Sequence, residues 1–129
     1  MAARIMICDE DEGFRDRYSD ILNANGFEVL HAVNGMDCIN KLRNTKVDLV
    51  LMDLMMPMMS GVDTIRYIRG DDGMKDQNIV VITVLKMDEG LDHHLSELDV
   101  HNILIKPIDT WVLLKMVNKV LGRKHPIFN

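Results

Sequence analysis

The sequence contains 129 residues, of which 47% are hydrophobic, so a single domain can bury a substantial core. Its 15 Lys and Arg residues against 20 Asp and Glu give a formal net charge of -5 without any basic block, which argues against direct binding of nucleic acid. The N-terminus MAARIMICDEDE is too charged for a secretory signal, and no apolar run approaches the ~18 residues of a membrane span, so we expect a cytoplasmic protein without membrane contact.

Short apolar runs alternate with segments of helical spacing along the whole chain. The runs are too compact for helices and predict strands at Arg4 to Cys8, Phe27 to His31, Asp48 to Met52, Asn78 to Thr83 and Asn102 to Ile105. Apolar residues at helical spacing predict helices around Phe14 to Leu22, Cys38 to Leu42, Val62 to Ile68, Leu91 to Leu98 and Val112 to Leu121. Suitable capping residues flank them, with N-caps at Asn34, Ser60 and Asp109 and C-terminal caps at Gly26 and Gly122.

This alternation predicts an α/β fold with a doubly wound parallel sheet. The first, third and fourth runs are apolar at nearly every position, as expected of strands covered by helices on both faces, whereas the second run is mixed and suits a sheet edge. We expect one domain over residues 1–129, with a core of about residues 3–122 and a short tail at 123–129. The polar stretch at 70–78 is the longest predicted loop, and it has no obvious chemistry.

Polar residues follow four of the five predicted strands. The first strand is followed by Asp9 and Glu10, the third by Asp53 and the fifth by Lys106, while the fourth ends in Thr83. Ligands of open parallel sheets bind beyond the carboxyl ends of the strands. We therefore expect three carboxylates, a hydroxyl and an ammonium group to meet in one site.

Three neighbouring carboxylates favour a divalent cation, because without one they repel each other and raise each other's pKa. Their hard oxygen atoms favour Mg²⁺, or alternatively Mn²⁺, over zinc. An ammonium at Lys106 and a hydroxyl at Thr83 suit the oxygens of a phosphoryl group. The pattern predicts phosphoryl transfer, with Asp53 as the nucleophile that forms an aspartyl phosphate.

At these residues the chain resembles the receiver domain of two-component response regulators. The match runs in order through IMICDED, LVLMDLMMPMMSG, VVITV and ILIKP, and it covers nearly the whole chain. The resemblance implies a flavodoxin-like strand order 2-1-3-4-5, a cis peptide before Pro107, and a histidine kinase or histidine phosphotransfer protein as the phosphodonor of Asp53. It implies a signalling module that turns over no small metabolite, and relatives often form homodimers through their fourth and fifth helices.

The resemblance also implies a role for each site residue. Glu10, Asp53 and the backbone carbonyl of Met55 would bind Mg²⁺ directly, and Asp9 would act through water. Thr83 and Lys106 would contact the phosphoryl group.

Several residues depart from the family pattern. Ile103 stands where the family usually has an aromatic ring, Val84 replaces a small residue after Thr83, and Asp99 and Val100 replace a common Gly-Ala pair. Met55 and Leu85 are apolar at positions where polar side chains of relatives help to place an attacking water. We expect slow self-hydrolysis of the phosphorylated protein, which timed loss of the label would test.

Other conspicuous residues have simpler interpretations. The methionines at 52–59 either pack the core and the loop or form a soft docking surface for the phosphodonor. Cys8 and Cys38 fit small buried hydrophobes. In the last helix, Val112, Leu113, Met116, Val117, Val120 and Leu121 predict a core stripe that leaves Trp111 and Leu114 to a partner face or to the core edge. The histidines have no metal spacing and are expected to be incidental, namely His31, His93, His94, His101 and His125.

Two other functions compete with this interpretation. Asp9, Glu10 and Asp11 read as a DxD motif after the first strand, as in haloacid dehalogenase-type Mg²⁺-dependent phosphatases or phosphotransferases, where Asp9 would be the nucleophile. The chain is short for the cap domain of such an enzyme, which would also need another acidic motif after a later strand. A flavodoxin-like FMN binder is disfavoured, because the first loop, DEDEG, would repel phosphate.

Overall fold

A computed structural model describes residues 2–84 and 89–123, and strands alternate with helices throughout it. The strands are β1 (Arg4–Cys8), β2 (Glu28–Ala32), β3 (Leu49–Asp53), β4 (Ile79–Thr83) and β5 (Ile103–Ile105). They form one parallel sheet in the order β2-β1-β3-β4-β5, which confirms the expected topology. The register places Met6 beside Leu30 and Val50, and Asp53 beside Ile82.

The helices are α1 (Glu12–Ala24), α2 (Gly35–Asn44), α3 (Gly61–Gly70), α4 (Glu89–Glu97) and α5 (Thr110–Val120). Each of the N-caps expected at Asn34, Ser60 and Asp109 accepts a hydrogen bond from a backbone N–H in the first turn of its helix. Gly26 and Gly122 follow the C-caps of α1 and α5 with φ of 88° and 69°, a conformation that favours glycine. Local chemistry therefore fixes these helix ends.

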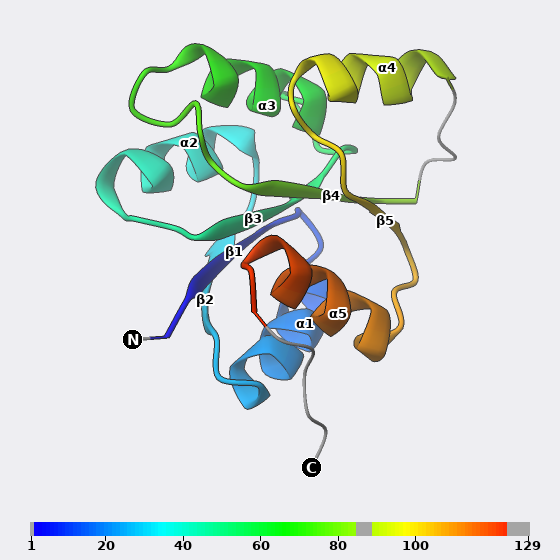
Figure 1. The fold of residues 1–129 in the computed structure, drawn as a ribbon. Helices are drawn as coiled ribbons and strands as arrows, with labels where there is room; N and C mark the ends of the chain where they lie inside the picture. Colours follow the sequence, from blue (N-terminus) through cyan, green and yellow to red (C-terminus); the bar gives the residue numbers. More distant parts are fainter. Residues whose placement is uncertain (1, 85–88, 124–129) are drawn as a thin grey trace.

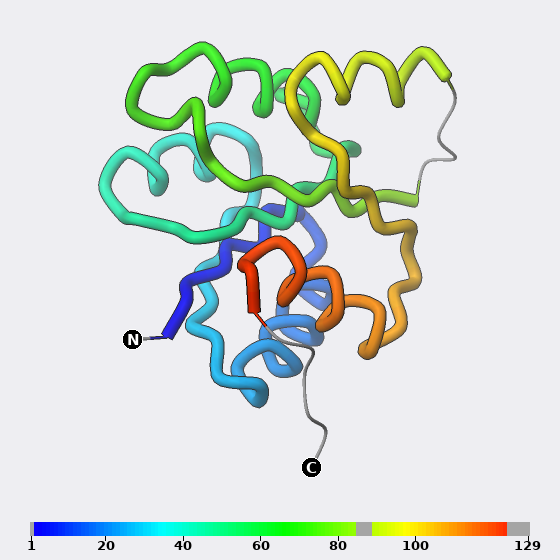
Figure 2. Tube along the Cα trace, viewed as in Figure 1, coloured from blue at the N-terminus to red at the C-terminus, as the bar shows by residue number. Residues whose placement is uncertain are grey.

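The sheet is the middle of three layers. Figure 1 shows α2, α3 and α4 on one face of the sheet and α1 and α5 on the other. Although α1 and α5 stand at opposite ends of the chain, they lie side by side (Figure 2), and the Tyr18 hydroxyl donates a 3.0 Å hydrogen bond to the carbonyl of Ile108 just before α5. Separate apolar clusters fill the two interfaces, one around Met6, Val50 and Val81 and one around Ile5, Leu51 and Val80.

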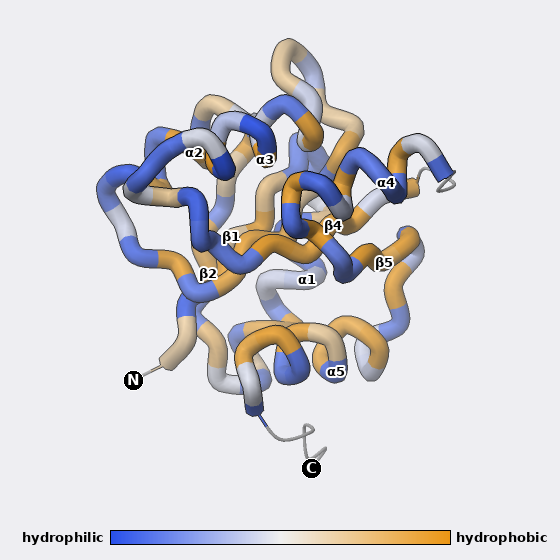
Figure 3. Tube along the Cα trace, turned by 45° about the horizontal axis from the view of Figure 1, so that its top comes forward, coloured by the Kyte–Doolittle hydropathy of each residue, from blue (hydrophilic) through white to orange (hydrophobic). Residues whose placement is uncertain are grey.

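Hydrophobic residues concentrate in the sheet, as the colours of Figure 3 show. All residues of β3 and β4 are buried, whereas β2 has one exposed and three partly buried residues, as expected of an edge strand. Cys8 and Cys38 are fully buried free thiols, which agrees with their interpretation as core residues. No helix in the described part of the chain has the length and apolarity that spanning a bilayer requires.

The core face of α5 differs from the expected stripe. Leu114 is fully buried together with Leu113 and Val117, whereas Val112 is 45% exposed. The helix begins at Thr110 and its core face runs through 113, 114 and 117. The assignment of Val112 to the core stripe was therefore wrong, and Leu114, which the sequence left to a partner face or to the core edge, belongs to the core. Trp111 is 42% exposed at the start of the helix.

Arg69 makes several of the hydrogen bonds that hold the polar stretch after α3. Arg69 Nε donates to the Leu98 carbonyl at 2.7 Å, and Arg69 Nη1 donates to the carbonyls of Lys75 and Gln77 at 2.8 Å each. Burial lowers the pKa of this guanidinium, while the charges of Asp99 and Asp76 oppose that effect. Arg69 therefore joins the loop after α3 to the connection between α4 and β5, at the sheet edge remote from the predicted site.

Candidate functional site

The polar residues predicted from the sequence lie together at the carboxyl edge of the sheet. Asp53 is the last residue of β3 and Thr83 the last of β4, while Asp9 and Lys106 directly follow β1 and β5. Asp9, Asp53 and Thr83 are 2%, 6% and 0% exposed. Because β1, β3, β4 and β5 are neighbours in parallel, their ends bring residues almost 100 positions apart into contact.

Lys106 joins the two buried carboxylates. Its Nζ donates a 2.5 Å hydrogen bond to Asp9 Oδ2 and lies 3.9 Å from Asp53 Oδ2. The ammonium also lies 4.0 Å from the ring centroid of Phe14, within the range of a cation–π interaction. The Lys106 backbone N–H donates to the Thr83 carbonyl at 2.9 Å, and the peptide between Lys106 and Pro107 is cis, as expected. The ammonium is therefore held by groups from the end of β1, the end of β3 and α1.

Asp53 carries a partly uncompensated charge. Burial and, after it, the charge of Asp9 raise the pKa of the Asp53 carboxyl above its usual range. The Met55 N–H, which donates to Asp53 Oδ1 at 3.2 Å, and the Lys106 ammonium pull the pKa down, while the charge of Glu10 raises it further. Such a carboxylate remains a nucleophile when it is ionised, and a nearby cation would stabilise its ionised form.

The loop after Asp53 approaches the strand so closely that it requires glycine at one position. A Cβ on Gly61 would lie 2.3 Å from the Asp53 carbonyl oxygen and 2.7 Å from the Leu54 Cα, which are backbone atoms that cannot turn aside. The Gly61 N–H donates to the Leu54 carbonyl at 3.0 Å and closes the loop just before α3 begins. Gly61 therefore shapes the segment that carries Met55.

The remaining predicted residues surround this centre. Glu10 is exposed beside the buried pair, and Met55 is 53% exposed. Val84, which replaces a small residue after Thr83, directs much of its side chain to solvent and is 65% exposed. Ile103 is partly buried against the core on the α2, α3 and α4 face. Leu85, named with Met55 for slow hydrolysis, lies outside the described residues, as does His125.

The acidic residues fit a hard divalent cation that retains water. Among the described residues, no three His, Cys, Asp or Glu side chains group closely enough to hold a metal by themselves. Mg²⁺ commonly takes only one or two carboxylates and keeps several waters. Asp9 and Asp53 supply hard oxygens, and the raised pKa of Asp53 marks negative charge that a cation would offset.

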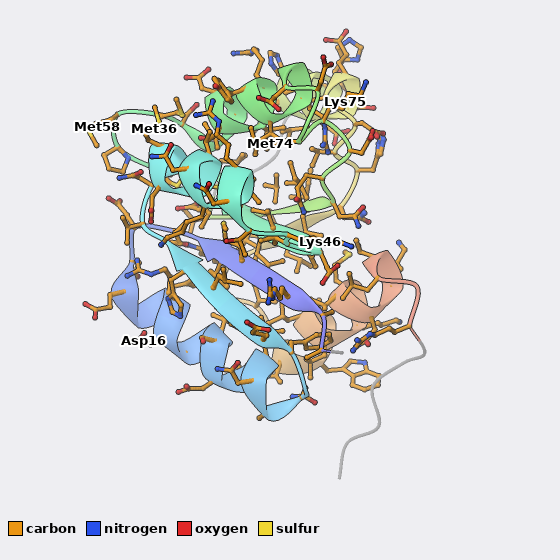
Figure 4. The ribbon with its side chains drawn as sticks, turned by 90° about the vertical axis from the view of Figure 1, so that its left-hand side faces the viewer. Asp16, Met36, Lys46, Met58, Met74 and Lys75 are labelled. Atoms are coloured by element: carbon orange, nitrogen blue, oxygen red, sulfur yellow. The ribbon has the colours of Figure 1, made fainter. Side chains whose placement is uncertain are left out.

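The methionines divide between core and surface. Met52 is fully buried, and Met56 is 9% exposed with its Sδ 3.6 Å from the Cys8 Sγ. Met58 is 93% exposed, and Figure 4 shows it beside Met36, which is 53% exposed at the start of α2. Exposed thioethers therefore lie at the same edge of the sheet as Asp53.

Two residues at this edge were not predicted from the sequence. Phe14 lies against Lys106, and Arg15 is 8% exposed with its Nη1 donating to the Asp9 carbonyl at 2.7 Å. The sequence carried a signal for Arg15, since it shares a helical face with the buried Tyr18 and Leu22. A positively charged side chain on an otherwise buried face of a helix indicates a specific partner inside the protein.

Comparisons with known proteins agree with this arrangement. The sequence model of the response regulator receiver domain matches residues 5–118. The polar-differentiation response regulator DivK of Brucella anthropi is 24% identical over 122 residues, which cover 95% of this chain and 98% of DivK. The transcriptional regulatory protein CpxR homolog of Haemophilus influenzae is 31% identical over 122 residues, which cover 94% of this chain but 51% of that protein.

The fold is also similar to solved structures. The chemotaxis protein CheY4 of Vibrio cholerae superposes with a TM-score of 0.87 at 24% identity, over 94% of this chain and all of CheY4. At this identity the likeness concerns the fold, namely a five-stranded parallel sheet flanked by helices on both faces.

Proposed function

Because this chain belongs to the response regulator receiver domain family, which serves two-component signalling, we propose that Asp53 is its phosphoacceptor. The observation that carries the assignment is the contact of one ammonium, Lys106, with both Asp9 and Asp53 at the ends of three strands. Of the acidic residues there, Asp53 stands at the end of the central strand, and it has both a raised pKa and a backbone N–H at its carboxylate.

The reaction is an in-line transfer to a carboxylate. An Asp53 carboxylate oxygen attacks the phosphorus atom of a phosphohistidine, the P–N bond breaks, and an acyl phosphate forms while the imidazole leaves with the electron pair. Lys106 provides positive charge for a phosphoryl oxygen, and Thr83, at the adjacent strand end, provides a hydroxyl donor. We assign no turnover of a metabolite to this site, only phosphorylation and dephosphorylation of the domain itself.

Mg²⁺ is the cofactor that the donor set favours. Glu10, Asp53 and the Met55 carbonyl would hold it directly, with Asp9 through water. When bound, the ion offsets negative charge on the phosphoryl oxygens. Lys106 keeps the second buried carboxylate, Asp9, paired at 2.5 Å.

The haloacid dehalogenase alternative receives no support. The receiver family model covers nearly all of the chain, from residue 5 to residue 118. Asp9, the nucleophile in that alternative, is 2% exposed and hydrogen-bonded to Lys106, whereas Glu10 beside it is exposed.

The phosphodonor in this proposal is a histidine kinase or a histidine phosphotransfer protein. Beside Lys106 a pocket of about 460 Å³ opens, with Phe14, Tyr18, Val84 and Pro107 among its lining residues. It provides apolar surface directly next to the reacting group. A protein phosphodonor can bury such surface while it presents its phosphohistidine.

A second partner is another copy of the chain. Ile105, Trp111 and Val112 are 48%, 42% and 45% exposed, and they belong to β5 and the first turn of α5. Apolar residues at this exposure favour association of two chains through β5 and α5, of which α5 belongs to the expected homodimer surface of α4 and α5.

Intact-mass measurement tests the assignment of Asp53. With Mg²⁺ and acetyl phosphate, the wild type should gain the mass of one phosphoryl group, and Asp53→Asn should gain none. Asp9→Asn serves as the matched variant, because it should retain some labelling at a reduced rate. A labelled Asp53→Asn protein would contradict the proposal. If Asp9→Asn were also unlabelled, Asp9 would replace Asp53 as the phosphoacceptor.

A further inference from the structure

Arg15 links the turn that carries Asp9 to the edge strand of the sheet. Its Nη1 donates to the Asp9 carbonyl at 2.7 Å, and its Nε donates to Nδ1 of His31, in β2, at 3.2 Å. Arg15 is 8% exposed, and a buried guanidinium restricts its neighbours strongly because it needs fixed acceptors. His31, which the sequence indicated to be incidental, is therefore one of the two acceptors of a buried cation.

The carbonyl that Arg15 holds belongs to the peptide that leads into Glu10. A peptide group is planar, so fixing the Asp9 oxygen also fixes the direction in which the Glu10 backbone leaves. The Asp9 side chain has separate restraints, since Oδ1 accepts from the Asp11 N–H at 2.9 Å and Oδ2 accepts from Lys106. Arg15 consequently acts on the placement of Glu10, whose exposed side chain is not held by burial.

The contact with Arg15 sets the hydrogen-bonding role of His31. Arginine only donates, so His31 Nδ1 is the acceptor of Arg15 Nε at 3.2 Å. The other ring nitrogen, Nε2, lies 3.4 Å from the Ser19 hydroxyl.

The other charged groups around His31 come from the elements packed against β2. The Lys41 ammonium of α2 donates to the His31 carbonyl at 2.5 Å and is paired with Asp37 at 3.1 Å. In β1, the residue opposite His31 is the apolar Ile7. In α1, the acidic residues on the side of Ser19, Glu12 and Asp16, are exposed to solvent. Two cations, Arg15 and Lys41, thus lie close to His31.

We propose that Arg15 is a positioning residue for the phosphorylation site and that the acceptor His31 maintains its position, so that loss of either contact weakens Mg²⁺ binding and phosphorylation of Asp53. This inference rests on the proposed function. Without the ring nitrogen of His31, Arg15 Nε loses its acceptor. The guanidinium is then held only at the Asp9 carbonyl, and the turn between Asp9 and Glu10 loses part of its restraint.

Mg²⁺ affinity, measured by calorimetry without a phosphodonor, tests the role of Arg15 directly. Arg15→Met should weaken Mg²⁺ binding about tenfold, as loss of a residue that orients a metal ligand does. His31→Asn keeps an acceptor oxygen at the place of Nδ1, whereas His31→Leu removes the acceptor. Mg²⁺ affinity should therefore fall in His31→Leu and stay near the wild-type value in His31→Asn. Phosphorylation rates with acetyl phosphate should follow the same order.

His94→Asn is the matched control, because His94 Nε2 lies 2.6 Å from the Arg66 guanidinium, remote from Asp9. It should retain the wild-type Mg²⁺ affinity. Unchanged Mg²⁺ affinity in Arg15→Met with lowered thermal stability would reduce Arg15 to a structural residue and overturn the inference. Equal Mg²⁺ affinities of wild type and His31→Leu would do the same, even if Arg15→Met failed to fold. A wild type that binds Mg²⁺ but is not labelled at Asp53 would instead overturn the proposed function.

Discussion

At the scale of single residues, the site contains a buried carboxylate whose negative charge is only partly offset by neighbouring groups. Asp53 is 6% exposed and lies near Asp9, and both burial and that charge raise its pKa. Lys106 and the Met55 N–H offset part of the cost. A protein that keeps such a carboxylate ionised at neutral pH gives up stability for a reactive group.

Replacing Asp53 should therefore stabilise the metal-free protein. At pH 7 Asp53→Asn should raise the free energy of unfolding by on the order of 1 kcal/mol, because it removes an ionised group that the folded state disfavours. A pKa that is higher in the folded than in the unfolded state means that this cost applies above the folded pKa. It disappears as the pH falls below the unfolded value, since the group is then protonated in both states.

Urea unfolding in EDTA at several pH values measures this effect. The difference between wild type and Asp53→Asn should be largest near neutrality and should close in acid. Asp72→Asn, in the exposed turn after α3, is the control and should change stability by less than about 0.5 kcal/mol. A less stable Asp53→Asn protein at pH 7 would contradict this account of the charge.

At the scale of elements, strand ends and helix starts place the site residues. β3 delivers Asp53, and α3 begins eight residues later at Gly61, whose missing Cβ allows the loop to pass against the strand. The loop includes Met58 with φ of 66°, an uncommon conformation for a residue other than glycine. The connection is thus tightly specified in the backbone as well as in its side chains.

Adding one methyl group at Gly61 should disturb the site. Gly61→Ala should lower the free energy of unfolding by about 2 kcal/mol, because backbone atoms must move to accept the Cβ. It should also slow phosphorylation, since the displaced loop carries Met55. Gly70→Ala, at the other end of α3, meets no atom within 4 Å and should leave stability unchanged or slightly raised. Equal effects of the two substitutions on urea unfolding and labelling rate would contradict the role of the close approach.

The sequence predicted the elements well where hydrophobic period and capping agreed. Asn34, Ser60 and Asp109 cap helices because their side chains satisfy backbone N–H groups locally. In α5 the apolar residues nearly surround the helix, so their pattern fitted more than one face, and packing on the sheet buried Leu114 instead of Val112.

The site itself was predictable only in part. Asp9, Asp53, Thr83 and Lys106 stand at strand ends, and parallel topology alone brings such ends together. Arg15 and His31 lie inside a helix and an edge strand, where their pairing depends on how α1 packs against β2. Sequence spacing carries no information on that contact.

At the scale of the whole molecule, the sheet separates two apolar layers and collects the polar chemistry at one edge. The surface formed by β5 and the start of α5 has apolar residues that the single chain leaves partly uncovered, namely Ile105, Trp111 and Val112. It lies next to Lys106, so a change at the site and a change in association can be coupled.

Phosphorylation should therefore increase self-association through this surface. Trp111→Glu should raise the dissociation constant of the phosphorylated dimer about tenfold or more, as loss of a central aromatic contact does. Light scattering after size-exclusion chromatography measures it over a range of concentrations. Tyr67→Glu is the control, since Tyr67 is equally exposed at 42% but lies on α3. A phosphorylated wild type that stays monomeric at every concentration would contradict the dimer.

Arg69 connects the end of α3 to the end of α4. α3 starts at the loop that follows Asp53, and in its last turn Arg69 donates to the carbonyls of Lys75, Gln77 and Leu98. Because Leu98 directly follows α4, one guanidinium restrains the ends of both helices. We therefore expect a displacement of the loop after Asp53 to move the start of α3 more than its end.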